Sequence, residues 1–186
     1  MIALRPARPE DAAAIAAIYA PYVLTGTVSF ESDPPDASVM RERMAAGDGL
    51  YPWLVATNGE DDGGVIAYAY ASRFRERPAY RYVVEASIYV AGPVQGQGAG
   101  KLLYAALIDT VRAQGFVQAV AVISLPNDYS IQLHEGVGFR RAGILREMGF
   151  KQGRWLDIGF WQCDLNDAAI PPIEPKKFTD VGMVRD

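Results

Sequence analysis

The sequence predicts an α/β fold, and three observations lead to it. Runs rich in β-branched and aromatic residues alternate with alanine- and leucine-rich helical runs between residues 2 and 165. The β-forming run at residues 82–90 leads through a glycine-rich loop directly into a strongly helical run. The length of 186 residues suits one domain with a sizeable core. We therefore expect a single domain built from a sheet and helices.

The elements are expected in the order strand, two helices, three strands, helix, strand, helix and two strands. The strands are expected at residues 2–5, 53–56, 64–71, 82–90, 117–124, 142–150 and 155–165. The helices are expected at residues 9–22, 36–46, 101–115 and 130–137. A proline followed by two acidic residues at positions 9–11 is typical of a helix start. Gly47, Gly115 and Gly138 end the other three helices, and the polar run at residues 58–64 indicates a hairpin turn. Residues 168–186, rich in proline and lysine, are expected to form an extended or disordered tail after a domain at residues 1–167.

Composition excludes several classes of function. The net charge of −4 and the pI near 5.1 argue against a nucleic-acid partner. The first residues lack an apolar signal core and no run reaches membrane-spanning length, so we expect a cytoplasmic protein without a membrane partner. Cys163 is the one cysteine and His134 the one histidine, which excludes an internal disulfide and a zinc cluster of Cys and His ligands. Cys163 is expected to be a small core residue.

A glycine-rich loop precedes the third helix. It comprises Gln95, Gly96, Gln97, Gly98, Ala99, Gly100 and Lys101. Small residues allow close approach of the backbone, and a helix N-terminus offers unpaired N–H groups and a positive dipole end, which together can seat a phosphate or pyrophosphate. The dinucleotide fingerprint and the Walker A pattern both fail here. The remaining Gln-x-x-Gly-x-Gly pattern resembles the coenzyme A pyrophosphate loop of the GNAT N-acetyltransferases, with a plain glycine-rich turn as the alternative.

A second motif strengthens this resemblance. Asn127 ends a strand, a short helix follows, and Gly138 and Phe139 close it, as in the second signature of that superfamily. Five further stretches are similar to the phosphinothricin and methionine sulfone/sulfoximine N-acetyltransferases: residues 27–30, 51–56, 79–82, 125–128 and 149–157. The resemblance spans about residues 2–165. It implies the acetyltransferase fold, a mixed and mostly antiparallel central sheet flanked by helices.

The resemblance also implies acetyl-CoA as cosubstrate, with no metal. The glycine loop would bind its pyrophosphate. The backbone at the end of the preceding strand, including Ser87, Ile88 and Val90, would bind the pantetheine arm. Asn127 would bind the pantetheine amides, although a helix N-cap is nearly as good an interpretation.

Glu85 is the candidate general base. It shares period-two spacing with Ser87 and Tyr89 in a strand that is otherwise Val, Ala and Ile, so its carboxylate should be partly desolvated and its pKa raised. The glutamate at this position is the base in the resembling family. The alternative is a structural ion pair with Arg81 or another arginine, which would lower the pKa.

His134 is the candidate acid for the departing thiolate, because it stands seven residues after Asn127, where many acetyltransferases carry a tyrosine. A lone histidine on a short helix is, however, more often packed or hydrogen-bonded. Tyr129 is a second candidate, and a weakly basic thiolate needs no more than a solvent proton.

Arginines at positions 73, 75, 77 and 81 precede the Glu85 strand and suit carboxylate, phosphinate or sulfonyl oxygens. We select Arg75, Arg77 and Arg81 for substrate binding, with Phe30 and Tyr80 as walls; the alternative is a solvated basic loop. Val83 stands where family members commonly carry Thr, which removes a substrate hydrogen bond and leaves the choice of amine open.

The expected function is acetyl transfer from acetyl-CoA to the amino group of a small amino-acid-like substrate. The alternative is a coenzyme A-binding sensor or interaction domain without turnover. Acetylation of a ribosomal or other protein N-terminus is disfavoured by the arginine cluster. Homodimers are common in the resembling group, and the apolar C-terminal strands would supply an interface.

Overall fold

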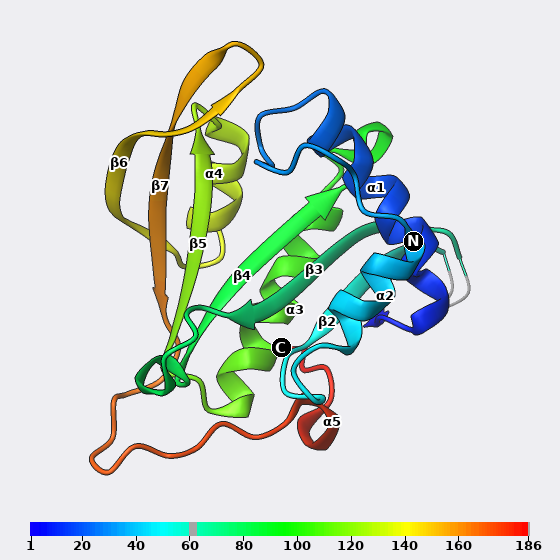
Figure 1. Cartoon of the computed structure of the whole chain (residues 1–186). Coiled ribbons are helices and arrows are strands. Elements are labelled where there is room, and N and C mark those ends of the chain that lie inside the picture. The colour runs from blue at the N-terminus through cyan, green and yellow to red at the C-terminus, as the bar shows by residue number, and fades with distance from the viewer. Residues whose placement is uncertain (60–62, 186) are drawn as a thin grey trace.

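The computed structural model describes residues 1–59 and 63–185, which contain a seven-stranded sheet in the order β1-β2-β3-β4-β5-β7-β6 (Figure 1). The strands are β1 (Ile2–Pro6), β2 (Trp53–Asn58), β3 (Val65–Arg73), β4 (Val83–Val90), β5 (Gln118–Leu125), β6 (Arg140–Lys151) and β7 (Arg154–Asp164). Neighbouring strands pair antiparallel except β4 and β5, which are parallel. The predicted mixed and mostly antiparallel sheet is therefore confirmed. β2 and β3 pair as expected, but residues 60–62 of the predicted turn lie outside the described residues.

Helices cover both faces of this sheet. They are α1 (Ala12–Leu24), α2 (Ala37–Ala45), α3 (Ala99–Gln114), α4 (Asp128–Glu135) and α5 (Phe178–Val181). α1 and α2 lie in front of the sheet in Figure 1, and α3 lies behind it. Each layer has its own core: Leu103, Leu107 and Val111 of α3 pack on one face, and Ile15 and Tyr19 of α1 pack on the other. Cys163 is buried in the first core, as predicted.

Local chemistry sets the ends of the helices. The predicted first helix begins as a 3₁₀ turn, Pro9–Asp11, whose Asp11 carboxylate forms a buried ion pair with Arg5 at 2.7 Å. Asp36 caps α2 by accepting a hydrogen bond from the Val39 N–H. Gly115 ends α3 at φ 95°, a conformation that favours glycine.

The single parallel pair determines where a site can form. β4 and β5 pair only from Val83 opposite Gln118 to Glu85 opposite Val120. Beyond Glu85 the two strands separate towards their C-terminal ends (Figure 1). The interior of the sheet is therefore open between the second half of β4 and the second half of β5.

The tail, which we expected to be extended or disordered, lies against the domain. Glu174 binds Arg81, the Lys176 N–H donates to the Gln114 carbonyl oxygen, and α5 packs on α3. The guanidinium of Arg185 donates to the Leu4 carbonyl oxygen. Proline-rich sequence lacks helix-forming runs, but here specific polar contacts hold it against the domain. The boundary at residue 167 stays a prediction.

Candidate active site

A groove follows the opening between β4 and β5 and ends at the glycine loop. Three adjoining cavities form it, with volumes of 40, 200 and 230 Å³. The first and second share Ile88, Asn127 and Ser130, and the second and third share Tyr129 and Leu133. We call the first cavity the β4–β5 gap; its lining residues are Val28, Ala86, Ser87, Ile88, Tyr89, Val122, Ile123, Ser124, Asn127, Ser130 and His134.

The glycine loop forms the far end of this groove. Gly96, Gly98, Gly100 and Lys101 line its third cavity. Gly98 is the N-cap of α3 at φ 88°, and it provides no side-chain cap for the first N–H groups of the helix. A Cβ on Gly100 would come within 3.1 Å of Val90 Cγ2, so glycine lets α3 start close against β4. The arrangement leaves helix N–H groups available for an anion, as the sequence indicates.

Ala99 and Gln97 of the loop have structural positions. Ala99 is buried in the first turn of α3, and Gln97 Nε2 donates to the Pro93 carbonyl oxygen at 3.1 Å. Neither lines the groove cavities, so their expected contact with a ligand stays a prediction.

Main-chain groups of β4 alternate between β3 and the groove. The Ala91 N–H bonds the Ile66 carbonyl oxygen across β3, so by the antiparallel alternation Ser87 and Tyr89 also direct their main chain to β3. Ile88 and Val90 consequently present their N–H and C=O groups to the groove. For Ser87, the main chain therefore pairs within the sheet, while its side chain lines the β4–β5 gap.

The Tyr22 hydroxyl bonds the main-chain groups of Val90 in this structure, a contact that sequence reasoning missed. This hydroxyl donates to the Val90 carbonyl oxygen at 2.5 Å and accepts from the Val90 N–H at 3.3 Å. Gln95 Nε2 donates to the same hydroxyl at 2.9 Å. No local motif marks Tyr22, because it lies 68 residues from Val90 in the chain.

Glu85 is the last residue of β4 that pairs with β5, and its side chain is 31% exposed. Burial raises the pKa of its carboxyl, and the Arg75 guanidinium opposes this rise. The closest Arg75–Glu85 contact, Nη1 to Oε2, is 3.9 Å. The expected partly desolvated carboxylate is present, and the weak ion pair involves Arg75 rather than Arg81.

His134 is placed as a packed residue. It is 5% exposed, its ring lies edge-on to Tyr104 and Phe139, and its Nδ1 is 2.7 Å from the Ser130 carbonyl oxygen. Since a carbonyl oxygen only accepts, Nδ1 carries the proton and Nε2 of the neutral ring is an acceptor. Burial lowers the pKa of His134 to about 4. At neutral pH this ring lacks a proton to give to a leaving group in the β4–β5 gap.

Tyr129 lies away from the expected position of the thioester, and the side chain of Asn127 is partly used in a helix cap. The Gly96 N–H donates to the Tyr129 hydroxyl at 3.4 Å, which places that hydroxyl at the glycine-loop end of the groove. Asn127 Oδ1 accepts a hydrogen bond from the Ser130 N–H at 3.1 Å, so Asn127 caps α4 as the alternative interpretation expected. Asn127 nevertheless lines the groove, so its amide N–H₂ is the group that could reach a ligand there.

The arginines do not converge on one point. Arg75 lies over the Phe74 ring at 4.3 Å and faces Glu85, while Tyr80 meets the same ring edge-on. Arg77 precedes a short 3₁₀ turn and is exposed. Arg81 binds Glu174 of the tail at 2.7 Å through its guanidinium.

Phe30 and Val83 lie at different sides of the site. The Phe30 ring packs on Gly149 of β6, where a Cβ would come within 2.3 Å of it. Val83 begins β4 opposite Gln118 and shares the Glu85 face by alternation. Their substrate contacts stay predictions.

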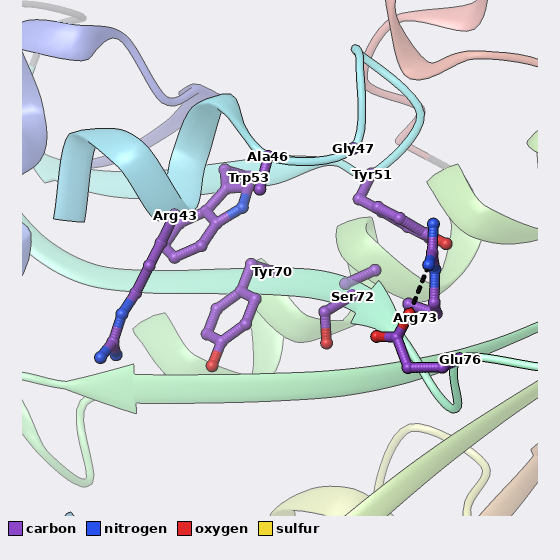
Figure 2. Close-up of a pocket in the computed structure, with 10 residues that line it drawn as sticks. Arg43, Ala46, Gly47, Tyr51, Trp53, Tyr70, Ser72, Arg73 and Glu76 are labelled. Atoms are coloured by element: carbon purple, nitrogen blue, oxygen red, sulfur yellow. Dashed lines mark hydrogen bonds and ion pairs between the residues drawn. The ribbon is translucent and has the colours of Figure 1, made fainter. Parts of the chain in front are cut away.

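A pocket of 430 Å³ over β2 and β3 was not anticipated from the sequence (Figure 2). Ser72, which lies directly opposite Glu85 in the β3–β4 ladder, lines it together with Tyr70 and Trp53. The Trp53 and Tyr70 rings stack at 4.1 Å, and Arg43 of α2 extends past them in Figure 2. These residues are distributed over 30 positions of the chain, so only the strand register brings them beside Glu85.

A family model described as an acetyltransferase (GNAT) domain matches residues 4–159. The chain belongs to the GNAT acetyltransferase family. This acetyltransferase is 41% identical over 175 residues to the phosphinothricin N-acetyltransferase of Streptomyces viridochromogenes, with 94% of each chain covered. It is 36% identical over 173 residues to the L-methionine sulfoximine/L-methionine sulfone acetyltransferase of Pseudomonas paraeruginosa, covering 91% of this chain and 98% of that one. A crystal structure of the phosphinothricin acetyltransferase from Sinorhizobium meliloti in complex with AcCoA matches with a TM-score of 0.85 and 39% identity over 97% of each chain. The predicted family and fold are confirmed.

Two further properties of the acetyltransferase concern the described residues. None of its helices there is both long and apolar enough to cross a bilayer. Across residues 1–59 and 63–185, no three His, Cys, Asp or Glu side chains gather in a way that could hold a metal ion.

Proposed function

We propose that this acetyltransferase moves the acetyl group of acetyl-CoA to the amino group of a small amino-acid-like substrate. Phosphinothricin, methionine sulfone and methionine sulfoximine represent the substrate type, as in the named relatives. One observation carries the proposal: a single groove connects the glycine loop at the start of α3 with the opening of the sheet that begins at Glu85.

The groove suits a nucleotide thioester along its length. The N–H groups at the start of α3 would bind the pyrophosphate, and the Ile88 and Val90 main chain would bind the pantetheine amides. Tyr22 would give up at least one of its bonds to Val90 when the arm enters. Asn127 lines the same stretch and would donate from its amide.

Glu85 would act as general base for the attacking amine. Amines are mostly protonated at neutral pH, so a group must accept a proton before or during attack. A raised pKa brings the carboxylate closer to the working pH. Arg75, at 3.9 Å, keeps enough of the carboxylate ionised to accept that proton. Since burial keeps the His134 ring a neutral acceptor, we assign neutralisation of the thiolate to a solvent proton.

The amine would approach from the face of the sheet that carries Glu85. The 430 Å³ pocket opens on this face beside Ser72 and is bordered by Arg43 and Arg73. Arg43 forms an ion pair with Glu31, and Arg73 forms one with Glu76. Arg75 donates to the Phe74 carbonyl oxygen at 2.8 Å, and its ion pair with Glu85 is long at 3.9 Å. Arg75 is therefore the cation best placed to bind an acidic head group of the substrate.

We further propose a cytoplasmic homodimer. Apolar side chains are exposed on the β6–β7 hairpin: Ile144, Leu145, Met148, Phe150 and Trp155. A cluster of this kind on one hairpin is typical of an interface. Analytical ultracentrifugation of the protein, with Trp155→Ser as the comparison, would measure the mass in solution.

The competing function is a coenzyme A-binding domain without turnover. A thiol-reactive dye, acetyl-CoA and a panel of amines that includes the three named compounds separate the two. Thiol release that depends on an amine supports the enzyme. Acetyl-CoA binding without thiol release from any amine supports the sensor.

A further inference from the structure

The wall of the β4–β5 gap contains a buried hydroxyl group without a role in the mechanism above. Ser124 is 7% exposed. Its Oγ has no hydrogen-bond partner among the residues that the structure describes. Buried hydroxyls are nearly always hydrogen-bonded, so a ligand or water in the gap is needed to complete this one.

The strand register places Ser124 on the reactive side of the sheet. Val120 is the parallel partner of Glu85, and side chains alternate along a strand. Val122 and Ser124 therefore lie on the same face as Glu85, with Ser87 on that face of the opposite strand. A ligand arm that enters from the glycine loop passes Ser124 before it reaches Glu85.

The other serine hydroxyls in the lining of the gap have side-chain partners: Ser130 Oγ lies 3.3 Å from His134 Nδ1, and Ser87 bonds to Tyr70. His134 offers an acceptor through Nε2, and its Nδ1 is bound to Ser130. The Asn127 oxygen is used in the helix cap. Tyr89, the remaining titratable side chain of the lining, packs edge-on against the Tyr19 ring. The Asn127 amide can still donate in the gap, and Ser124 adds a hydroxyl that has no partner among the described residues.

We propose that the Ser124 hydroxyl donates a hydrogen bond to the sulfur of coenzyme A as the thioester breaks, an inference that rests on the proposed function. The amine nitrogen forms the new C–N bond, and the C–S bond breaks with its electron pair going to sulfur. The amine proton passes to Glu85 and then to solvent, and a solvent proton later neutralises the thiolate. Ser124 keeps its own proton and stabilises the charge on sulfur through a charge-assisted hydrogen bond.

Three variants test this role. Ser124→Ala removes the hydroxyl, Ser124→Thr keeps it with a side chain suited to a strand, and Ser38→Ala on the exposed surface of α2 is the matched control. Ser124→Ala should lower kcat by about 10- to 100-fold, equivalent to about 1.4–2.7 kcal/mol, with the KM for acetyl-CoA within twofold. The thiol of bound coenzyme A should titrate at a higher pH in Ser124→Ala than in the wild type. Ser124→Thr and Ser38→Ala should resemble the wild type in both measurements.

Two results would overturn the assignment. One is an unchanged kcat in Ser124→Ala. The other is a raised KM for acetyl-CoA with kcat intact, because the hydroxyl would then bind the arm away from the reacting sulfur. The thiol titration needs no amine substrate, so a wild type that acetylates none of the amines refutes the proposed function while the titration still decides the role of Ser124. A wild type that does not bind coenzyme A refutes both.

Discussion

Replacing Glu85 by Gln tests the central step most directly. The amide keeps the shape of the side chain and removes its ability to accept a proton. A positioned general base contributes about 10²- to 10⁴-fold to a rate, or about 2.7–5.4 kcal/mol. Because the Glu85 side chain is 31% exposed, solvent can partly replace it, and we expect the lower end, about 10²-fold in kcat/KM at pH 7.

The pH profile sharpens this test. Burial raises the pKa of Glu85, so the wild-type kcat/KM should fall on the acid side at a pH above the ordinary carboxyl value of 4.5. Arg75→Met should move this limb to still higher pH, because the cation at 3.9 Å favours the carboxylate. That interaction is worth about 1 kcal/mol when screened by water, as suits a guanidinium that is 51% exposed. The Glu85→Gln defect should shrink at alkaline pH, where more of the amine is already neutral.

Stability provides the control for this substitution. A raised carboxyl pKa means that the folded state binds the proton more tightly than the unfolded state does. The stability associated with Glu85 is thus fully present below pH 4.5 and is lost as the pH rises through the folded pKa. Denaturant unfolding of Glu85→Gln should give a higher free energy of unfolding than the wild type at pH 7, with no such gain below pH 4.5. Glu42→Gln, an exposed carboxylate on α2, should change neither property. A kcat/KM of Glu85→Gln within twofold of the wild type from pH 5 to pH 9 would refute the base.

Three further substitutions separate structural from functional roles. His134→Phe should keep kcat within threefold. Because burial lowers the pKa of His134 to about 4 in the folded state, the wild type should lose about 3 kcal/mol of unfolding free energy between pH 6.5 and 4, and His134→Phe should abolish this loss. A tenfold fall in kcat would restore the acid role. Gly98→Ala should cost about 1 kcal/mol in thermal unfolding through its positive φ and should raise the KM for acetyl-CoA but not for the amine, and an unaltered acetyl-CoA KM would place the pyrophosphate elsewhere. Arg81→Ala should expose the tail to limited proteolysis and leave the KM for the amine unchanged. Arg75→Met, by contrast, should raise the KM for the amine. A raised amine KM in Arg81→Ala would return that arginine to the substrate site.

Motifs that are continuous in sequence predicted their part of the structure well. The glycine loop and the strand before it lie within 20 residues, so their relative placement follows from one strand–loop–helix unit. The partly desolvated carboxylate of Glu85 was predictable, because Glu85 is the one charged residue in a mostly apolar strand. The ion pair of Arg81 was not foreseeable, because Glu174 lies 93 residues away in a tail that composition suggests is extended or disordered. The substrate contact of Arg81 stays a prediction. For His134, no sequence signal shows that the Ser130 carbonyl oxygen fixes the tautomer.

The pocket proposed for the substrate depends on contacts between distant segments, which explains why sequence reasoning missed it. Ser72 and Tyr70 become visible only through the β3–β4 register, and Arg43 only through the packing of α2. The loop that carries Phe30 is held by Lys151 of β6, whose ammonium group donates to the carbonyl oxygens of Ser29 and Glu31. No local sequence pattern marks these contacts. A lysine that binds carbonyl oxygens, for example, has the same sequence context as a lysine exposed to solvent.

In the proposed function, the interruption of the β4–β5 pair brings cofactor binding and chemistry together in one place. Strands that separate inside a sheet leave main-chain groups that must find other partners. Two tyrosines meet this need on the open edge of β4: the Tyr104 hydroxyl donates to the Ala86 carbonyl oxygen at 3.3 Å, and Tyr22 bonds both main-chain groups of Val90. Ile88 lies between them on the same edge. An open edge is a template for any extended chain with amide groups, and the pantetheine arm carries two. An arm bound in this register would run along β4 towards Glu85, so the feature that costs the sheet its pairing would also aim the thioester at the proposed base.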